Sequence, residues 1–469
     1  MDDDMMTDDT GGVFSPRFRG FTIGLLASVG SVAFESLGVA TILPSVATEL
    51  GGLGGYGWGL SALMLANIVG TVIAGVDIDR RGPARTVLVG TLVFAFGCLL
   101  AGLAPGWGVF IVARALQGLG IGAIMAYAYS LVGIAYPARL QAVMFAFLSS
   151  AWTIPSLVGP VFAGALASLL DWRVVFWSIA PLTLLLLPLV LPDARRLAST
   201  APRPASGPRR RIPAPVWFSI LLAAGTGAVL LGLELDALLA LVALVIGGLV
   251  GAIVALRWIL PTGTLRLRRG APTGLVIRFV LCGVYFGSEA FLPLGLTSVH
   301  GLGITLAGLG LAAGALAWTA GSFAQARIDA VRPGRRALAT RLGILALVGG
   351  ELIMGVAVAL PEVWAGWAVI GWTIAGIGMG VAFNAATSAT MSTTPADSAG
   401  RVSASLQLAQ TLATATVAGV GGAIVARLGA TTPAFLAVFG LTAALGLLGV
   451  LLAGRLDTAQ AGDGEGGHR

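Results

Sequence analysis

The feature that most constrains this chain is a series of apolar stretches, each long enough to cross a lipid bilayer. A membrane-spanning helix needs about 20 apolar residues, because each residue advances the helix by about 1.5 Å through a hydrocarbon core about 30 Å thick. The sequence predicts fourteen such helices, and therefore an all-α polytopic membrane protein. The predicted spans cover residues 21–43, 57–75, 86–103, 107–131, 142–166, 174–191, 216–233, 237–256, 274–296, 304–324, 337–360, 364–386, 405–425 and 434–452.

The amino-acid composition argues against most other classes of protein. Hydrophobic residues make up 57% of the chain and charged residues 10%, whereas soluble domains run at about 45–50% apolar and about 25% charged. This argues against a soluble enzyme, a nucleic-acid-binding protein and a disordered protein. Cys98 and Cys282 both lie in apolar stretches, and two histidines are too few for a His-based metal site. We therefore expect no metal site and no cofactor.

The distribution of Arg predicts the orientation in the membrane. All 28 basic residues are Arg, which indicates a GC-rich bacterial genome. If the N-terminus is inside, 24 of them fall on the cytoplasmic side, with Arg341 counted there because it lies at the cytoplasmic end of its span. Arg173 and Arg427 fall outside, and Arg114 and Arg278 lie deeper within spans. The positive-inside rule requires this asymmetry, so both termini are expected in the cytoplasm. Removing the pair of spans in 216–256 would leave every other orientation unchanged, so charge does not distinguish fourteen spans from twelve.

Basic segments divide the chain into two halves. The stretch 194–215 holds six Arg among Pro, Ser and Ala, which is typical of a solvated linker. Two six-span halves predict the repeat architecture of a secondary transporter. The acidic N-terminus lacks the basic start of a secretory signal, so we expect no cleavage. The expected organisation is a cytoplasmic tail (1–20), a six-helix bundle (21–193), an Arg-rich linker (194–215), two additional transmembrane helices with a basic loop (216–273), a second six-helix bundle (274–454) and a cytoplasmic tail (455–469).

Four short motifs occur at defined positions in the first half. The loop at 75–85 reads Gly-Val-Asp-Ile-Asp-Arg-Arg-Gly-Pro-Ala-Arg. The fourth span contains Arg-Ala-Leu-Gln-Gly from Arg114, and the fifth contains Gly-Pro-Val-Phe-Ala-Gly from Gly159. The first span has an acid at Glu35 and ends in Thr-Ile-Leu-Pro at Pro44. Together these motifs resemble the signatures of the major facilitator superfamily, and in particular its branch of 14-span drug:proton antiporters.

The resemblance implies a major facilitator fold and a conformational latch in the loop at 75–85. In such a latch a carboxylate caps the N-terminus of a helix in the other half, and Arg binds nearby carbonyls or acids. The alternative is that these charges only set the topology. In the second half the counterpart loop has Gln325 where the acid should be, which argues against a second latch. The residues assigned to the latch are Gly75, Asp79, Arg80, Gly82 and Arg85.

The resemblance also implies an antiporter motif in the fifth span, formed by Gly159, Pro160 and Gly164. Small residues allow helices to approach closely, and Pro frees a carbonyl and bends the helix. Ala163 stands where the family has another Gly. The alternative for this segment is ordinary packing of small residues.

Four charged residues lie deep within predicted spans, where each costs about 2.5–3.5 kcal/mol on insertion scales. At about 1.5 Å per residue, Glu35, Glu289, Glu351 and Arg114 all lie about 20 Å from the cytoplasmic side. We expect Glu35 and Arg114 to be close, because both belong to the first bundle. A carboxyl without a partner can exchange a proton, so Glu35 or Glu289 is the expected proton carrier. Arg114 and Glu351 are further candidates for proton coupling, although the resemblance implies that the helix of Glu351 supports the bundle rather than lining the cavity. The alternative for each acid is a purely structural carboxyl.

Several polar and aromatic residues within spans are candidates for lining a substrate cavity. Indole rings could contact an amphipathic ligand by stacking or cation–π interaction. Packing against lipid is the alternative for the Trp residues, and bonding between helices is the alternative for the amides. The candidates are Asn67, Gln117, Trp152, Trp318, Trp372, Asn384 and Gln407.

These observations predict a secondary active exporter that exchanges protons for drugs or other amphipathic compounds by alternating access, with the proton gradient as its energy source. The close alternative is an exporter or flippase of lipid or glycolipid; a metabolite symporter, a receptor and an integral-membrane enzyme fit less well. The expected partners are amphipathic small molecules or lipids, protons and the bilayer, without nucleic acid. We expect a monomer in the bacterial cytoplasmic membrane, with the additional helices in 216–256 as peripheral additions to the two bundles.

Overall fold

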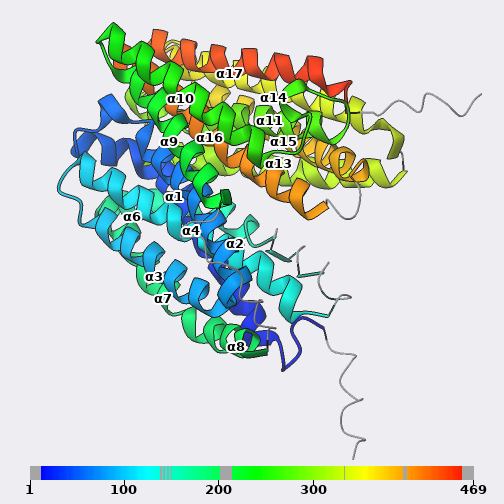
Figure 1. Ribbon diagram of the computed structural model, residues 1–469. Coiled ribbons are helices and arrows are strands. Elements are labelled where there is room, and N and C mark those ends of the chain that lie inside the picture. The colour runs from blue at the N-terminus through cyan, green and yellow to red at the C-terminus, as the bar shows by residue number, and fades with distance from the viewer. Residues whose placement is uncertain are drawn as a thin grey trace, which may run out of the picture.

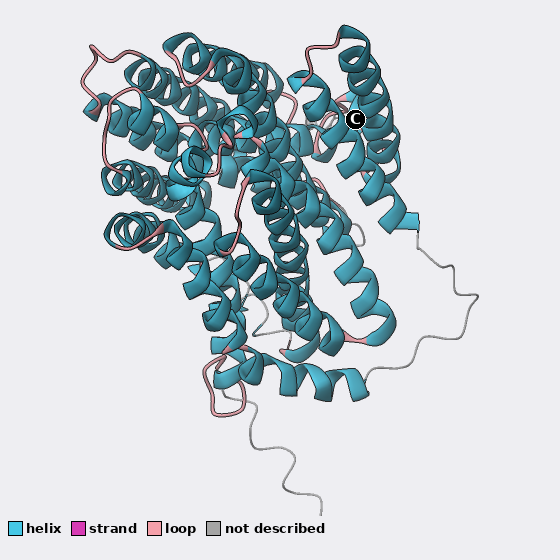
Figure 2. Cartoon of the chain, turned by 90° about the vertical axis from the view of Figure 1, so that its left-hand side faces the viewer, coloured by secondary structure: helices cyan, strands magenta, loops and turns pink. Residues whose placement is uncertain are grey.

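The structure is a computed structural model that describes residues 12–137, 140, 143–144, 147–148, 150–200, 214–331, 333–394 and 399–456. Within these ranges every regular element is a helix (Figure 2). Figure 1 shows two groups of helices side by side, which diverge toward the side where α1 (Arg19–Glu49) begins and α17 (Thr432–Ala453) ends. The end at which the first helix begins also carries Arg17, Arg80, Arg266 and Arg335, and we call it the Arg-rich end. The other end is the Arg-poor end.

The helices of the first group, the N-half, form from apolar segments that are separated by residues favouring turns and helix caps. Gly82 has a positive φ of 78° and forms the tight turn between the second and third helices, and Pro83 begins the third. Asp171 caps a later helix by accepting a bond from the backbone N–H of Arg173. The helices are α1 (Arg19–Glu49), α2 (Trp58–Arg81), α3 (Pro83–Gly102), α4 (Trp107–Ala135), α6 (Thr153–Leu169), α7 (Trp172–Leu184) and α8 (Leu187–Thr200).

The second group, the C-half, contains a span in which the helical hydrogen bonding is interrupted briefly at Ala290 and Phe291. The expected span 274–296 consists of α11, which ends at Glu289, and a short helix α12 that begins at Leu292. Pro293 in the first turn of α12 lacks a backbone N–H, so a continuous helix would lose a bond there. The helices are α11 (Ala271–Glu289), α12 (Leu292–Ser298), α13 (Ile304–Val331), α14 (Arg336–Ala359), α15 (Gly366–Ser392), α16 (Ala399–Leu428) and α17 (Thr432–Ala453).

The additional pair, α9 (Ala214–Glu234) and α10 (Leu238–Ile259), contacts both halves. Trp58 of α2 donates its indole N–H to Glu234 at 3.0 Å. Arg427 of α16 donates to the carbonyl oxygens of Leu233 and Leu235, at 2.9 and 2.8 Å. Through α9 the additional pair therefore contacts both halves at the Arg-poor end.

The number of spans agrees with the sequence only in part. Within the described residues, twelve helices are long and apolar enough to cross a membrane, and the pair α7–α8, bent by 41°, makes a thirteenth if it counts as one span. The fifth predicted span is represented by the shorter helix α6. The fourteen-span arrangement remains a prediction. Of the expected linker 194–215, the residues up to Thr200 belong to α8, and residues 201–213 lie outside the described ranges.

The two halves meet through close contacts toward the Arg-poor end. The hydroxyl of Tyr56 donates to the carbonyl of Ala290 at 3.1 Å, and that of Ser61 donates to the carbonyl of Ala415 at 2.8 Å. A Cβ atom on Gly57 would lie 2.9 Å from the Cα of Gly422, so glycine is required for this approach. These contacts hold α2 of the N-half against α11 and α16 of the C-half.

Candidate functional site

The N-half contains a fully buried ion pair between Glu35 and Arg114. The two side chains are 0% and 1% exposed and are bonded directly to each other. Arg114 also donates to the carbonyl of Gly59 and to the amide oxygen of Gln117, both at 2.7 Å. The structure therefore brings Glu35 and Arg114 together. It places Gln117 at 0% exposure within this cluster, rather than on an open surface.

Glu351 is a second buried carboxyl, but its neighbours are hydroxyl groups. One carboxyl oxygen contacts the hydroxyls of Ser288 on α11 and Thr442 on α17, and the other has no partner in the described structure. None of these neighbours carries a positive charge. Because the side chain is 0% exposed, Glu351 is enclosed among the helices of the C-half.

Glu289 differs from the other two acids in its exposure and its partners. It is the last residue of α11, directly before the break in the helix, and it is half-buried. Within the described part of the chain it forms no hydrogen bond and no ion pair. The adjacent Ser288 contacts Glu351, while the following residue, Ala290, accepts the bond from Tyr56 of the N-half. Glu289 thus lies beside the contact between the two halves.

An aromatic cluster lies next to Glu289. Tyr285 stacks on Trp372 with ring centroids 4.3 Å apart and meets Trp318 edge-on at 5.1 Å. Trp318 also contacts Phe286 and Phe383, at 5.7 and 5.3 Å. Trp372 is fully buried and supports Tyr285, whereas Trp318 is half-buried. The aromatic cluster, defined as Tyr285, Phe286, Trp318, Trp372 and Phe383, joins α11, α13 and α15.

The other cavity candidates are dispersed. Asn67 accepts a bond from Thr71 within α2, and Asn384 donates to the carbonyl of Ser322 at 3.2 Å, which links α15 to α13. Trp152 packs against the core of the N-half, and Gln407 is exposed on α16. The structure does not bring these four residues into one cluster.

The expected latch residues lie at the Arg-rich end without mutual contacts. Asp79 and Arg80 are exposed, and neither forms a bond in the described part of the structure. Asp77 instead pairs with Arg81 at 3.2 Å and with Arg85 at 3.6 Å. Sequence reasoning missed Asp77, although its spacing of four residues from Arg81 is a recognised signal for a pair on one helix face. Residues 395–398, which precede α16, lie outside the described ranges.

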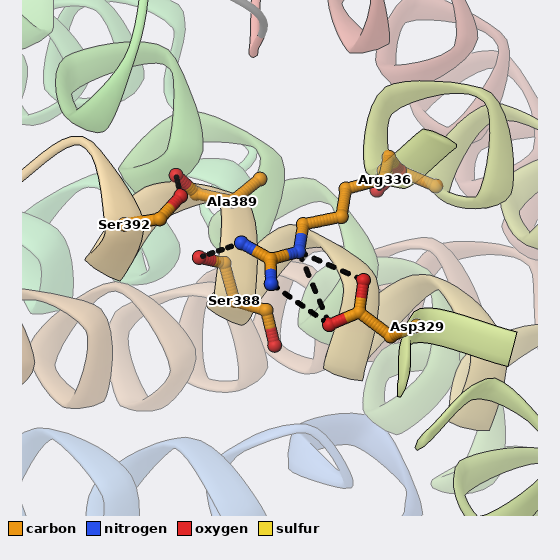
Figure 3. A network of polar contacts seen from close by, with 6 residues as sticks. Asp329, Arg336, Ser388, Ala389 and Ser392 are labelled. Atoms are coloured by element: carbon orange, nitrogen blue, oxygen red, sulfur yellow. Dashed lines mark hydrogen bonds and ion pairs between the residues drawn. The ribbon is translucent and has the colours of Figure 1, made fainter. Parts of the chain in front are cut away.

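The counterpart loop of the C-half contains an ion pair that the sequence analysis also missed. Arg336 binds both carboxylate oxygens of Asp329, with distances of 2.8 and 2.9 Å, and contacts the carbonyl of Ser388 at 3.4 Å (Figure 3). This arrangement fastens α13, α14 and α15 together at the Arg-rich end. Gln325 is buried four residues earlier, and its amide oxygen has no partner in the described structure.

The Gly-Pro segment of α6 lies where the N-half touches α13. A Cβ on Gly308 of α13 would lie 2.8 Å from the carbonyl oxygen of Pro160. A Cβ on Gly38 of α1 would lie 3.1 Å from the Cβ of Ala163. Gly159 faces Phe34, and Gly164 is buried. The small residues therefore serve close helix approach on both sides of α6.

A cavity of about 440 Å³ opens at the Arg-poor end. Its lining comes from both halves, with Thr48 and Glu49 at the end of α1, and Thr297 and Ser298 at the end of α12. Glu49 also binds Arg173 at 2.6 Å. The two halves are therefore separated by a cavity here, whereas they are in close contact at Tyr56 and Gly57.

Comparisons with known proteins place this geometry in a family. Residues 21–418 match the Major Facilitator Superfamily. The chain is 25% identical over 428 residues to a probable multidrug-efflux transporter of Mycobacterium tuberculosis, covering 87% of this chain and 88% of the relative. It is 27% identical over 160 residues to multidrug resistance protein 3 of Bacillus subtilis, covering 34% of this chain and 31% of the relative.

Solved structures support the same fold. A POT family transporter in complex with 5-aminolevulinic acid superposes with a TM-score of 0.67 at 13% identity, over 93% of this chain and 96% of the other. A peptide transporter POT in complex with sulfate gives a TM-score of 0.67 at 18% identity, over 93% and 95%. At these identities the similarity concerns the fold alone. The chain is a multi-pass membrane protein and a transporter rather than an enzyme, and it belongs to the Major Facilitator Superfamily.

Proposed function

We propose that this transporter is a proton-coupled exporter of drugs or related amphipathic compounds in the bacterial cytoplasmic membrane. The observation that carries the proposal is Glu289, a half-buried carboxyl without a partner in the described residues, located between the aromatic cluster and the contact of the two halves. An intramembrane acid of this kind is a candidate for proton transfer. The names of the efflux relatives support export of drugs as the direction and class of transport.

The arrangement of the halves supports alternating access. If the Arg-rich end faces the cytoplasm, the contacts of Tyr56, Ser61 and Gly57 close the outer side of the protein. The two halves then diverge toward the cytoplasm. Substrate then enters from the cytoplasm or the inner leaflet and binds beside Glu289 and Trp318. Rocking of the two halves breaks the outer contacts and opens the site toward the cavity near Thr48 and Ser298.

The three acids support different roles in this cycle. Glu35 is neutralised by Arg114, so a change in its protonation would leave a buried Arg without its partner. Glu351 is enclosed behind Ser288 and Thr442. Glu289 alone of the three has both exposure and an unused carboxylate. Ionised Glu289 holds the substrate-bound state, and a proton from outside neutralises it and promotes release.

Proton release from the purified, detergent-solubilised protein tests the proposal. Ethidium, tetraphenylphosphonium and a phospholipid are added to separate samples, and each addition is repeated at pH values that span about two units around neutrality. We expect release on adding the two cations, and we expect Glu289→Gln to abolish it. Glu362→Gln, at an exposed position, is the matched control and should behave as the wild type.

Two outcomes would count against the proposal. Release that persists in Glu289→Gln but disappears in Glu35→Gln would assign the role of proton carrier to Glu35 in the N-half. Binding of phospholipid without any proton release would instead favour the lipid-exporting alternative.

A further inference from the structure

Arg278 is a buried cation that the proposed transport cycle leaves unused. It lies in the second turn of α11 and is 6% exposed. Its guanidinium donates to the hydroxyl of Thr387 on α15 and lies over the ring of Phe383, with 3.6 Å between the guanidinium carbon and the ring centroid. The thiol of Cys282 lies beside it, one turn along α11. None of these three neighbours is an anion.

The surroundings leave the guanidinium incompletely satisfied. A guanidinium has five N–H donors in a planar fork that matches a carboxylate or a phosphate. A hydroxyl, a thiol and a ring face offer few acceptors and no negative charge. A buried charge without a counter-charge is costly, so an Arg in such a position indicates a functional role.

No acid in the described part of the chain compensates Arg278. Glu289 is eleven residues further along α11, which corresponds to about 16 Å and is too far for an ion pair. Glu351 lies behind Ser288 on a different face of α11. Arg114 shows the contrasting case, because the same chain neutralises that guanidinium with Glu35. Among the described residues Arg278 therefore has no counter-charge, and an anionic group of a bound ligand would supply one.

The position of Arg278 connects it to the aromatic cluster. Arg278, Cys282, Tyr285 and Glu289 follow one another at spacings of four, three and four residues, so they share one face of α11. The ring contacts of Tyr285 with Trp318 and Trp372 turn this face toward α13 and α15. One stripe thus carries a cation at one end, aromatic rings in the middle and a carboxyl at the other end.

We propose that Arg278 binds an anionic group, such as a carboxylate, phosphate or sulfonate, of the amphiphile that the protein transports. The apolar body of this ligand packs on the aromatic cluster, mainly on Phe286 and the half-buried Trp318. This inference rests on the proposed function, because it names the substrate class of the same site. It predicts that acidic or zwitterionic amphiphiles bind more tightly than uncharged analogues of the same shape.

A matched pair of probes tests the assignment. Dansyl-undecanoic acid and its methyl ester differ only in the anionic group, and energy transfer from Trp to dansyl reports their binding to the purified full-length protein. We expect the acid to bind the wild type more tightly than the ester. In R278Q the affinity for the acid should fall by about tenfold or more, while that for the ester changes less than about twofold. R278K should retain part of the preference, and R341Q, at an exposed site on α14, should match the wild type.

Three results would overturn the assignment. Equal affinities of acid and ester in the wild type would remove it without any variant, even if R278Q fails to fold. An equal loss of both probes in R278Q would indicate a structural role. Complete displacement of the acid by chloride at physiological concentration would indicate a site for an inorganic anion only.

The same preparation separates this inference from the proposed function. Proton release on adding ethidium depends on Glu289 and does not require Arg278. If the wild type releases no proton but prefers the acid to the ester, proton exchange is rejected and the anion site is kept. If the wild type releases protons but shows no preference for the acid, the anion site is rejected and proton exchange is kept.

Discussion

The two halves of this transporter differ in whether the charged side chains within their helices are paired with each other. In the N-half, Glu35 and Arg114 form a buried pair with Gln117 as an additional partner. In the C-half, Arg278, Glu289 and Glu351 lie apart, and each contacts uncharged groups or none in the described structure. A neutralised pair is costly to break, because either charge would be left buried without its partner, whereas separated charges remain available to a proton or a ligand. In the proposed cycle the C-half therefore provides the carboxyl that exchanges the proton.

The largest effect on stability is expected from breaking the pair in the N-half. Arg114→Gln leaves Glu35 enclosed without its counter-charge, and we expect a loss of about 3–5 kcal/mol in the free energy of unfolding. Titration of the detergent-solubilised protein with SDS measures this loss, and the buried thiols of Cys98 and Cys282 report unfolding through a thiol-reactive dye. The exposed Arg341→Gln is the control. A loss no larger than that of the control would contradict the assignment of a stabilising pair.

Replacing both partners sharpens this expectation. In Glu35→Gln with Arg114→Gln, two amides replace two charges, and no ion remains unpaired. We expect the double variant to be more stable than Arg114→Gln alone by about 1–3 kcal/mol. Additive losses in the same SDS titration would show that the two side chains act independently.

A smaller effect is expected at the enclosed acid of the C-half. Glu351→Gln keeps a carbonyl oxygen for Ser288 and Thr442 but buries an amide N–H₂ group, which should cost about 1–2 kcal/mol. If Glu351 carried the coupled proton, this variant would also lose proton release on adding ethidium. We expect proton release to persist.

The smallest effect on stability should accompany the largest effect on transport. Glu289 has no partner to lose within the described residues, so Glu289→Gln should change the free energy of unfolding by less than about 0.5 kcal/mol. Proton release should nevertheless disappear. A large destabilisation together with intact release would reverse the comparison between the halves.

The sequence was sufficient to predict features that depend on single segments. Span length and Arg placement located most helices, and similar depths along their helices predicted that Glu35 and Arg114 lie close together. The short interruption after Glu289 depends on the missing N–H of Pro293, which the length and hydropathy of the span do not reveal. The position of α9 between α2 and α16 depends on contacts between segments far apart in the chain, which no local pattern encodes.

The same distinction explains the result for the candidate site. Glu35, Glu289 and Glu351 have equivalent depths in the sequence, yet one is paired, one is enclosed and one is half-buried. Exposure is set by which helix packs on which face, and this is a property of the assembled bundle. Asp77 and Asp329 were missed for a related reason, since the family signature drew attention to Asp79 and Gln325 instead.

The bond between Tyr56 and Ala290 has a mechanical consequence. Ala290 directly follows Glu289 at the joint between α11 and α12, so the N-half holds the C-half at the joint that bears the carboxyl. In the proposed cycle, separation of the two halves breaks this bond, so the movement that opens the Arg-poor end also exposes Glu289 to water.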